Sequence, residues 1–371
     1  LTLLLIGMLT LAFNIQPVRA SGTIYIRADG SVDPPDAPIS TVDNVTYTLT
    51  DNINDSIVVE KSNIIIDGNG YTLQGTGYPS RGIYLYTVKN VTIKNANIKG
   101  FYHGIYLDSI YTSHNILSRN TITENEACGV YIVESSDNTI SGNTITGHSY
   151  GIYLDGDDMY PPHVDACFNN SIYGNTIANN IHGIYLEDYS KFNNIYENNI
   201  TDNHTGIKLH FRCDNNIISG NNITNNSGYG IHLRDDCDNN TISGNTITGH
   251  SQGDIPWGGL AILLDISNKE NMITENTIAN NNVGVYTYSS SNSSIYHNKF
   301  INNTDQVLTD SVNIWDDGYP SGGNYWSDYT GVDLYSGSNQ DYPSGSDGMG
   351  DSAYVIDVNN RDRYPLMYPW V

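Results

Sequence analysis

An internal repeat constrains this sequence more than any other feature. Residues 138–148 and 240–250 are identical, and both read Asn-Thr-Ile-Ser-Gly-Asn-Thr-Ile-Thr-Gly-His. Aligning all similar units places an Asn at positions 120, 143, 175, 198, 221, 245, 276 and 298. The successive differences are 23, 32, 23, 23, 24, 31 and 22, so the base period is 22–24 residues with two insertions. A repeat of this length is typical of a solenoid.

Each unit contains two short runs, an Asn-x-Ile type and a Gly-Ile-x-Leu type, separated by Asn, Gly and Ser. Alternation with period two and β-branched residues indicate strands, and no Ala/Leu-rich segment supports a helical repeat. One such unit cannot bury its apolar side, but stacked units share a continuous core. The sequence therefore predicts an all-β, right-handed parallel β-helix over residues 60–310, with the aligned Asn residues forming an internal ladder.

The ends of the chain differ from the repeat. Residues 1–20 begin with an apolar run and are interpreted as a signal peptide that lacks its start. Residues 21–59 are expected to form an N-terminal cap, and residues 311–371, rich in Trp, Tyr, Gly and Asp, a C-terminal cap. We expect a secreted or cell-surface protein, periplasmic if the organism has an outer membrane.

The composition narrows the range of partners. The formal charge is 16 − 40 = −24, which disfavours nucleic acids and anionic membranes. A polysaccharide or a cell-envelope glycan is the expected partner, and self-association is a second. Eleven sequons would accept N-glycans in an exported protein: Asn44, Asn54, Asn90, Asn169, Asn199, Asn203, Asn222, Asn225, Asn239, Asn292 and Asn302.

In each Gly-Ile-x-Leu-x run the Ile and Leu point inward, and the two x positions point outward on one face. Tyrosines dominate the first outward column, and carboxylates are frequent in the second. Such a surface can stack sugar rings and accept their hydroxyl protons. The alternative is that tyrosine simply packs well on a sheet. The candidate carbohydrate-binding residues are Tyr106, Tyr131, Tyr153, Tyr185, Asp108, Asp155 and Trp257, the last from an insertion.

The same columns become charged over three coils, between the insertions at 156–165 and 251–258. Lys208 or Arg234 could neutralise a uronate carboxylate while a histidine abstracts the neighbouring proton. Asp155 with Glu187 or Asp265 could alternatively act as a hydrolase pair. A surface charge network without any reaction is the third interpretation. The candidate catalytic residues are Glu187, Lys208, His210, His232, Arg234 and Asp265.

Two further patterns predict a calcium site and a disulfide bond. Asp347 and Asp351 lie in a Gly-rich loop whose oxygen ligands would suit Ca²⁺, although an Asp/Gly turn explains the same residues. Cys213 and Cys237 are one coil apart and both precede Asp-Asn-Asn, so they are expected to stack within disulfide range. The alternative is a pair of reduced, buried thiols.

The repeats, together with residues 64–73, 323–329 and 364–367, resemble the NosD-type family of β-helix proteins. The resemblance implies a parallel β-helix and, from the family's name, copper handling. This chain has 5 Met and 4 Cys but no His-Met or Cys-x-x-Cys cluster, so copper is disfavoured. We expect a non-catalytic surface protein that binds polysaccharide or forms part of the envelope. The alternatives are a polysaccharide lyase, epimerase or hydrolase, and a periplasmic copper-related accessory protein.

Overall fold

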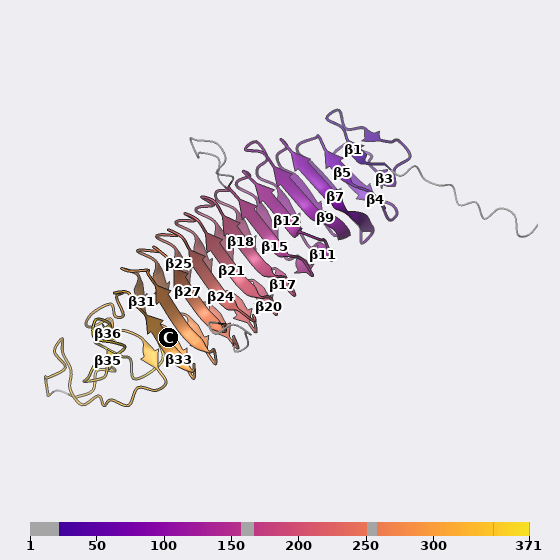
Figure 1. The fold of residues 1–371 in the computed structure, drawn as a ribbon. Coiled ribbons are helices and arrows are strands. Elements are labelled where there is room, and N and C mark those ends of the chain that lie inside the picture. Colours follow the sequence, from indigo (N-terminus) through magenta and orange to yellow (C-terminus); the bar gives the residue numbers. More distant parts are fainter. Residues whose placement is uncertain (1–21, 157–166, 251–257, 344, 371) are drawn as a thin grey trace, which may run out of the picture.

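The computed structural model describes residues 22–156, 167–250, 258–343 and 345–370. These residues form an elongated stack of parallel strands (Figure 1), which confirms the predicted parallel β-helix. Within these ranges, no helix is long and apolar enough to cross a membrane.

Each complete coil contributes one strand to each of three rows. The first, which we call the long-strand row, contains β5 (Ile57–Val59), β7 (Thr72–Tyr86), β9 (Asn97–Asp108), β12 (Cys128–Val133), β15 (Tyr150–Asp155), β18 (His182–Glu187), β21 (Thr205–His210), β24 (Tyr229–Arg234), β27 (Leu260–Asp265), β30 (Val283–Tyr288) and β33 (Asp305–Thr309).

Two rows of shorter strands close the coil. The short-strand row continues the same sheet and contains β11 (Thr121–Thr123), β14 (Thr144–Thr146), β17 (Thr176–Ala178), β20 (Asn199–Thr201), β23 (Asn222–Thr224), β26 (Thr246–Thr248), β29 (Thr277–Ala279), β32 (Lys299–Ile301) and β34 (Tyr325–Trp326). The opposite row forms a second sheet from β4 (Thr46–Leu49), β6 (Ile64–Asp67), β8 (Val91–Lys94), β10 (Ile116–Ser118), β13 (Thr139–Ser141), β16 (Ser171–Tyr173), β19 (Asn194–Tyr196), β22 (Ile217–Ser219), β25 (Thr241–Ser243), β28 (Met272–Thr274) and β31 (Ser294–Tyr296).

The ends carry irregular structure. β1 (Ile24–Ile26) pairs in parallel with β5, so the stacking extends into the segment expected to be the N-terminal cap. β2 (Val32–Asp33) and β3 (Ile39–Ser40) add antiparallel pairs at that end. The C-terminal segment contributes β35 (Tyr354–Val355) and β36 (Arg361–Asp362), which pair with each other.

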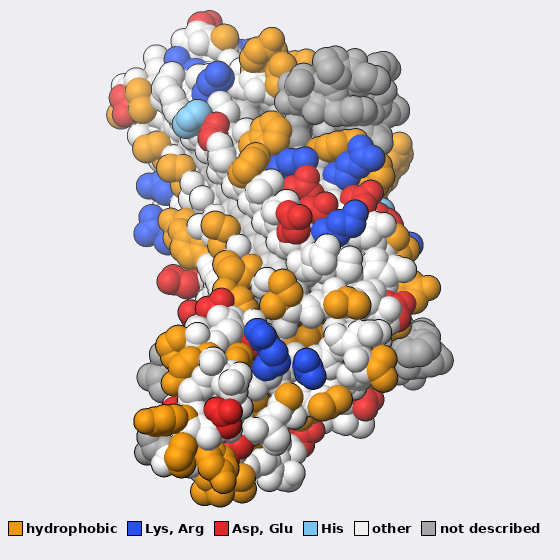
Figure 2. Space-filling model, turned by 90° about the vertical axis from the view of Figure 1, so that its left-hand side faces the viewer, with side chains coloured by type: hydrophobic (Ala, Val, Ile, Leu, Met, Phe, Trp, Pro, Cys, Tyr) orange, Lys and Arg blue, Asp and Glu red, His pale blue; other side chains and the backbone are white. Residues whose placement is uncertain are grey.

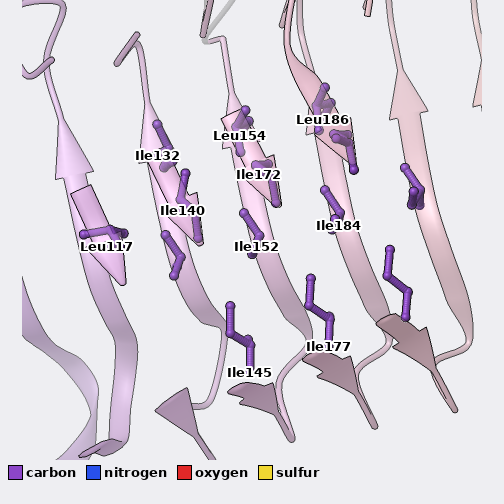
Figure 3. Packing of buried hydrophobic residues seen from close by; sticks show 14 of the residues in the cluster. Leu117, Ile132, Ile140, Ile145, Ile152, Leu154, Ile172, Ile177, Ile184 and Leu186 are labelled. Atoms are coloured by element: carbon purple, nitrogen blue, oxygen red, sulfur yellow. The ribbon is translucent and has the colours of Figure 1, made fainter. Parts of the chain in front are cut away.

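The core consists of aliphatic columns that run the length of the solenoid (Figure 3). Ile145, Ile177 and Ile200 occupy one register position on successive coils, and all three are fully buried. The glycine before most inward Ile residues permits the coils to approach closely: a Cβ on Gly183 would lie 2.6 Å from the carbonyl oxygen of Gly206. The coil of β27 instead accommodates the fully buried Ala261 at this position.

Buried asparagines form the predicted ladder. The Oδ1 atom of Asn198 accepts hydrogen bonds from the backbone nitrogen (3.1 Å) and the Nδ2 atom (3.0 Å) of Asn175 on the preceding coil. The Nδ2 atom of Asn198 donates to the carbonyl oxygen of Ile172 (2.8 Å) and to Asn221 (3.0 Å). Two parallel ladders that the sequence analysis did not separate pass through Asn193 and Asn203. The amides thus satisfy the polar backbone at the turns of every coil.

The ladder has a defined end in the C-terminal segment. The fully buried carboxylate of Asp362 accepts hydrogen bonds from the backbone nitrogen of Asn324 (2.7 Å) and from Nε1 of Trp326 (2.9 Å). It also accepts one from the backbone nitrogen of Tyr364 (3.0 Å). Trp326 in turn stacks on Phe300 of the preceding coil, with ring centroids 4.3 Å apart. The C-terminal segment therefore covers the last coil and completes its hydrogen bonds.

The structure corrects the prediction of a disulfide bond between Cys213 and Cys237. Cys213 and Cys237 lie on adjacent coils in the same register, but both are free, fully buried thiols. Each Sγ atom points to a backbone carbonyl of its own turn, at 3.2 Å from the oxygens of His210 and Arg234 respectively. The register argument placed the residues correctly, but it could not supply the side-chain orientation that an S–S bond needs.

Replacing one rung of the ladder should destabilise the protein. Asn198→Ala removes the side-chain partner of the backbone nitrogen of Asn175 and of the carbonyl of Ile172, at about 1–3 kcal/mol for each buried group left unsatisfied. We expect a clear fall in the urea unfolding midpoint. The exposed neighbour is the control, because Asn199→Ala should change the stability by less than about 0.5 kcal/mol. Equal midpoints for the two variants would contradict a stabilising ladder.

The free thiols can be tested by alkylation without a reductant. Burial raises the pKa of Cys213 well above its usual value, so the native protein should react slowly. After denaturation, Cys213 and Cys237 should both be alkylated in peptide maps. A peptide in which the two remain joined would show that the disulfide forms after all.

Candidate carbohydrate-binding face

The long-strand row presents one continuous column of outward residues, here called the tyrosine column. Strand register aligns its members in the predicted order, and extends the column at both ends. Its members are Tyr25, Val58, Tyr84, Tyr106, Tyr131, Tyr153, Tyr185, Lys208, His232, Leu263, Tyr286 and Leu308.

The tyrosine rings stack on one another along the solenoid axis. Ring centroids are 5.0 Å apart for Tyr106 and Tyr131, for Tyr131 and Tyr153, and for Tyr153 and Tyr185. Tyr106 is 8% exposed and Tyr185 only 5%. The coil spacing of about 4.8 Å suits stacked rings, so each ring covers the faces of its neighbours. The column therefore presents hydroxyl groups and ring edges to solvent, whereas the sequence analysis expected open ring faces.

A second aromatic column was not recognised in the sequence. It is formed by the residue that precedes Gly in several Gly-Ile-x-Leu runs, and includes His103, Tyr150 and His182. Tyr150 stacks on Tyr153 with centroids 4.9 Å apart, and His103 on Tyr131 at 4.8 Å. Burial lowers the pKa of His103 and His182 to about 4, so both are neutral near pH 7. The recurrence of aromatic residues before Gly was the available sequence signal.

Hydroxyl groups of the tyrosine column donate hydrogen bonds to carboxylates of the neighbouring column. Tyr84 donates to Asp108 (2.9 Å), and Tyr131 donates to Asp155 (2.7 Å), in both cases one coil further along. Burial, followed by the hydrogen bond to Asp108, raises the pKa of Tyr84 to about 12. The tyrosine column and the predicted carboxylates therefore form one hydrogen-bonded surface.

Glu187 is the centre of this surface. Tyr153 and Tyr185 both donate to its carboxylate, the latter at 2.7 Å, and Nδ1 of His210 lies 2.9 Å from Oε1. Burial by itself would raise the pKa of Glu187. The hydrogen bonds from His210, Tyr153 and Tyr185 outweigh it and lower that pKa to about 2. Glu187 is therefore a fixed anion at neutral pH.

The predicted basic residues are paired with carboxylates. Nε2 of His210 lies 3.1 Å from Oδ2 of Asp235, which the sequence analysis had not selected, and Nε of Arg234 lies 3.2 Å from the same oxygen. Asp265 lies 3.7 Å from Nε of Arg234 and 3.4 Å from Nε2 of His232. This arrangement matches the charge-network interpretation. Basic and acidic side chains also lie side by side on the face drawn in Figure 2.

Lys208 occupies the point where the tyrosine column becomes charged. Its Nζ atom lies 4.9 Å from the centre of the Tyr185 ring. Burial lowers its pKa, and the neighbouring Arg234 adds to the effect. Lys208 is thus a partly desolvated cation over an aromatic face, in a position to contact a ligand on this surface.

Register separates the proposed hydrolase pairs. Asp155, Glu187, His210, Arg234 and Asp265 occupy successive coils, so Asp155 and Asp265 are about 19 Å apart along the axis. Two carboxylates that flank a glycosidic bond lie about 5–9.5 Å apart. Asp155 and Glu187 are on adjacent coils and remain close enough.

The surface has a hollow where the tyrosine column is interrupted. Leu263 replaces an aromatic residue between His232 and Tyr286. Beside it lies a space of about 330 Å³ lined by Tyr229, Leu260, Leu263, Asp265, Tyr286 and Tyr288. We call this the Leu263 hollow. It combines an aliphatic floor, tyrosine walls and one carboxylate.

Comparison with family models identifies the chain's relatives. Residues 15–165 match the model described as "Right handed beta helix region". Residues 156–331 match the model described as "Periplasmic copper-binding protein (NosD)". The two matches together extend over residues 15–331, and each describes a part of the chain as similar to its family.

Solved structures share the fold of this protein at low identity. DFA-IIIase from Arthrobacter chlorophenolicus A6, without its lid and in complex with GF2, has a TM-score of 0.57 at 13% identity, covering 78% of this chain and 91% of that one. The Agl-KA catalytic domain has a TM-score of 0.51 at 16% identity, covering 72% and 61%. A search of curated proteins found no match.

The residues that the structure describes do not bring copper ligands together. In the ranges that the structure describes, no three His, Cys, Asp or Glu side chains converge in a way that could hold a metal ion. The four cysteines are buried, and the family's copper chemistry would need soft or imidazole ligands that meet at one point. We derive no function through copper.

The two carboxylates for which calcium binding was predicted accept hydrogen bonds from backbone N–H groups of the same C-terminal segment. Asp351 accepts backbone N–H groups of Leu334 (2.8 Å) and Tyr335 (3.1 Å), and Asp347 accepts that of Met349 (3.1 Å). These contacts match the turn interpretation, and calcium binding stays a prediction. Trp257 and most of both insertions lie outside the described residues.

The low pKa of Glu187 predicts an acid-dependent loss of stability. A carboxyl group with a folded-state pKa of about 2, below its ordinary value of 4.5, stabilises the fold above pH 4.5. That contribution disappears as the pH falls from 4.5 towards 2. We expect Glu187→Gln to show a smaller drop in thermal midpoint over this range than the unmodified protein. Parallel curves for the two proteins would exclude the proposed contribution.

Proposed function

We propose that this protein is an exported, non-catalytic polysaccharide-binding protein, and that its long-strand row is the binding face. The Leu263 hollow carries the proposal. Its leucine floor and tyrosine walls suit the apolar faces of a sugar ring, and Asp265 at its edge can accept sugar hydroxyl protons. The family description "periplasmic" agrees with export.

The chemistry of the charged network favours binding over catalysis. An effective general acid or base has a pKa near the working pH, whereas the pKa of Glu187 is about 2. His210 is engaged on both ring nitrogens by Glu187 and Asp235, and Arg234 is engaged by Asp235 and Asp265. These groups form a paired charge network at the proposed ligand surface.

A polysaccharide lyase, epimerase or hydrolase is the second candidate function. One observation favours it: the carboxylate of Glu187 orients the imidazole of His210 through Nδ1, as a third group often orients a catalytic base. Incubation with alginate and polygalacturonate, followed by ultraviolet detection of unsaturated ends and by a reducing-end assay, tests it. Turnover that His210→Ala abolishes would replace the binding proposal.

The binding proposal predicts a selective response to filling the hollow. We expect the protein to bind at least one of glucomannan, arabinoxylan, amylose, alginate and polygalacturonate in affinity electrophoresis. Leu263→Tyr places a ring between His232 and Tyr286 and occupies the hollow, so it should weaken binding about fivefold for each stacking contact that is lost, since each contributes on the order of 1 kcal/mol. The thermal midpoint should stay close to that of the unmodified protein.

A matched control lies on the opposite row. Ser219 points outward next to Tyr196 in the register of β19 and β22, so Ser219→Tyr adds the same side chain away from the proposed face. It should leave binding unchanged. The absence of binding to all five polymers, or equal affinities for Leu263→Tyr and Ser219→Tyr, would reject the proposed function.

A further inference from the structure

A second hollow lies on the same face, near the N-terminal end. It has a volume of about 390 Å³, and its lining includes Tyr25, Asp55, Val58, Ser80, Arg81 and Tyr84. We call it the Val58 hollow. None of its residues was selected as a binding residue in the sequence analysis.

The two hollows repeat one structural pattern. In each, an aliphatic residue interrupts the tyrosine column: Val58 lies between Tyr25 and Tyr84, and Leu263 lies between His232 and Tyr286. The missing ring leaves space, and the neighbouring tyrosines form walls. Each hollow also includes one carboxylate, Asp55 in the first and Asp265 in the second. The same interruption therefore creates two sites with similar chemistry.

The two hollows lie on the same column of the long-strand row. Eight coil steps in the strand register connect Val58 to Leu263, a distance of about 38 Å along the axis. From Tyr84 to Tyr185 the stacked tyrosines leave hydroxyl groups and carboxylates at the surface, and the next two coils carry Lys208 and His232 in place of tyrosine. Such a surface offers repeated hydrogen-bond partners to a repetitive polymer.

The charge of this face disfavours acidic polymers. The path carries the carboxylates Asp55, Asp108, Asp155, Glu187, Asp235 and Asp265, against the cations Arg81, Lys208 and Arg234, a formal balance of 3 − 6 = −3 when the histidines are left out of the count. Arg81 is engaged over the rings of Tyr84 and Tyr106, at 4.4 and 4.2 Å from their centres. An acidic polymer would be repelled by this face and by the chain's formal charge of −24.

We propose that one extended, uncharged polysaccharide chain lies along the solenoid axis and places a sugar ring in each of the two hollows. This inference rests on the proposed function and specifies its ligand as neutral, and long enough to reach about 38 Å. Occupying the second hollow is then an intramolecular step, which increases the overall affinity without any new type of contact.

Size-fractionated fragments of glucomannan, arabinoxylan and amylose, titrated by calorimetry, test the inference. Fragments that span both hollows should bind at least about tenfold more tightly than fragments that reach only one. Val58→Tyr should remove this gain while leaving the affinity of the short fragments for the Leu263 hollow unchanged. Tyr25→Ala, which removes a wall of the Val58 hollow instead of filling it, is a second variant if Val58→Tyr fails to fold.

Three results would overturn the inference while leaving polysaccharide binding intact. One is equal affinity for short and long fragments. Another is full retention of the length dependence in both Val58→Tyr and Tyr25→Ala. The third is tighter binding of alginate or polygalacturonate than of every neutral polymer. Failure of all polymers to bind would instead reject the proposed function itself.

Discussion

The distance between coils is the constraint on which the rest of this structure depends. Parallel backbone pairing fixes it at about 4.8 Å, and every side chain therefore lies directly above its equivalent in the previous coil. Asparagine is suited to this geometry because one amide can accept from the coil before and donate to the coil after, as Asn198 does. The same repetition builds the isoleucine core, so polar turns and apolar interior are stabilised by one spacing.

That spacing also decides what the outer face can bind. Aromatic rings at about 5 Å stack well, so the tyrosines from Tyr106 to Tyr185 bury one another's faces. A complete column is consequently a poor platform for sugar stacking, although it has the composition of one. Space for a ligand arises where the column is broken, at Val58 and Leu263. In this solenoid the exceptions to the repeat are better candidates for binding than the repeat itself.

The charged coils illustrate how far register reasoning extends. Sequence alignment correctly placed Glu187, His210, Arg234 and Asp265 on successive coils of one face. It could not show that Asp235, at a turn, reaches both His210 and Arg234 and joins them into a network. Turn residues lie outside the period-two pattern, and their side-chain directions depend on local backbone dihedrals. For this reason His210 and Arg234, which were predicted as catalytic residues, are paired with carboxylates.

The sequence by itself determined the fold class, the coil register, the inward columns and the main asparagine ladder, because a repeat of 22–24 residues with strand alternation allows few other arrangements. Only the tertiary structure decided which side chains meet within that register. Cys213 and Cys237 stack as predicted but turn their sulfur atoms to backbone carbonyls, and the tyrosines face one another instead of solvent. Register fixes Cα positions along one axis, whereas contacts also depend on side-chain torsions and on neighbours brought in by turns. The two hollows also depend on the tertiary structure, because the shape of a hollow is defined by all the side chains around it.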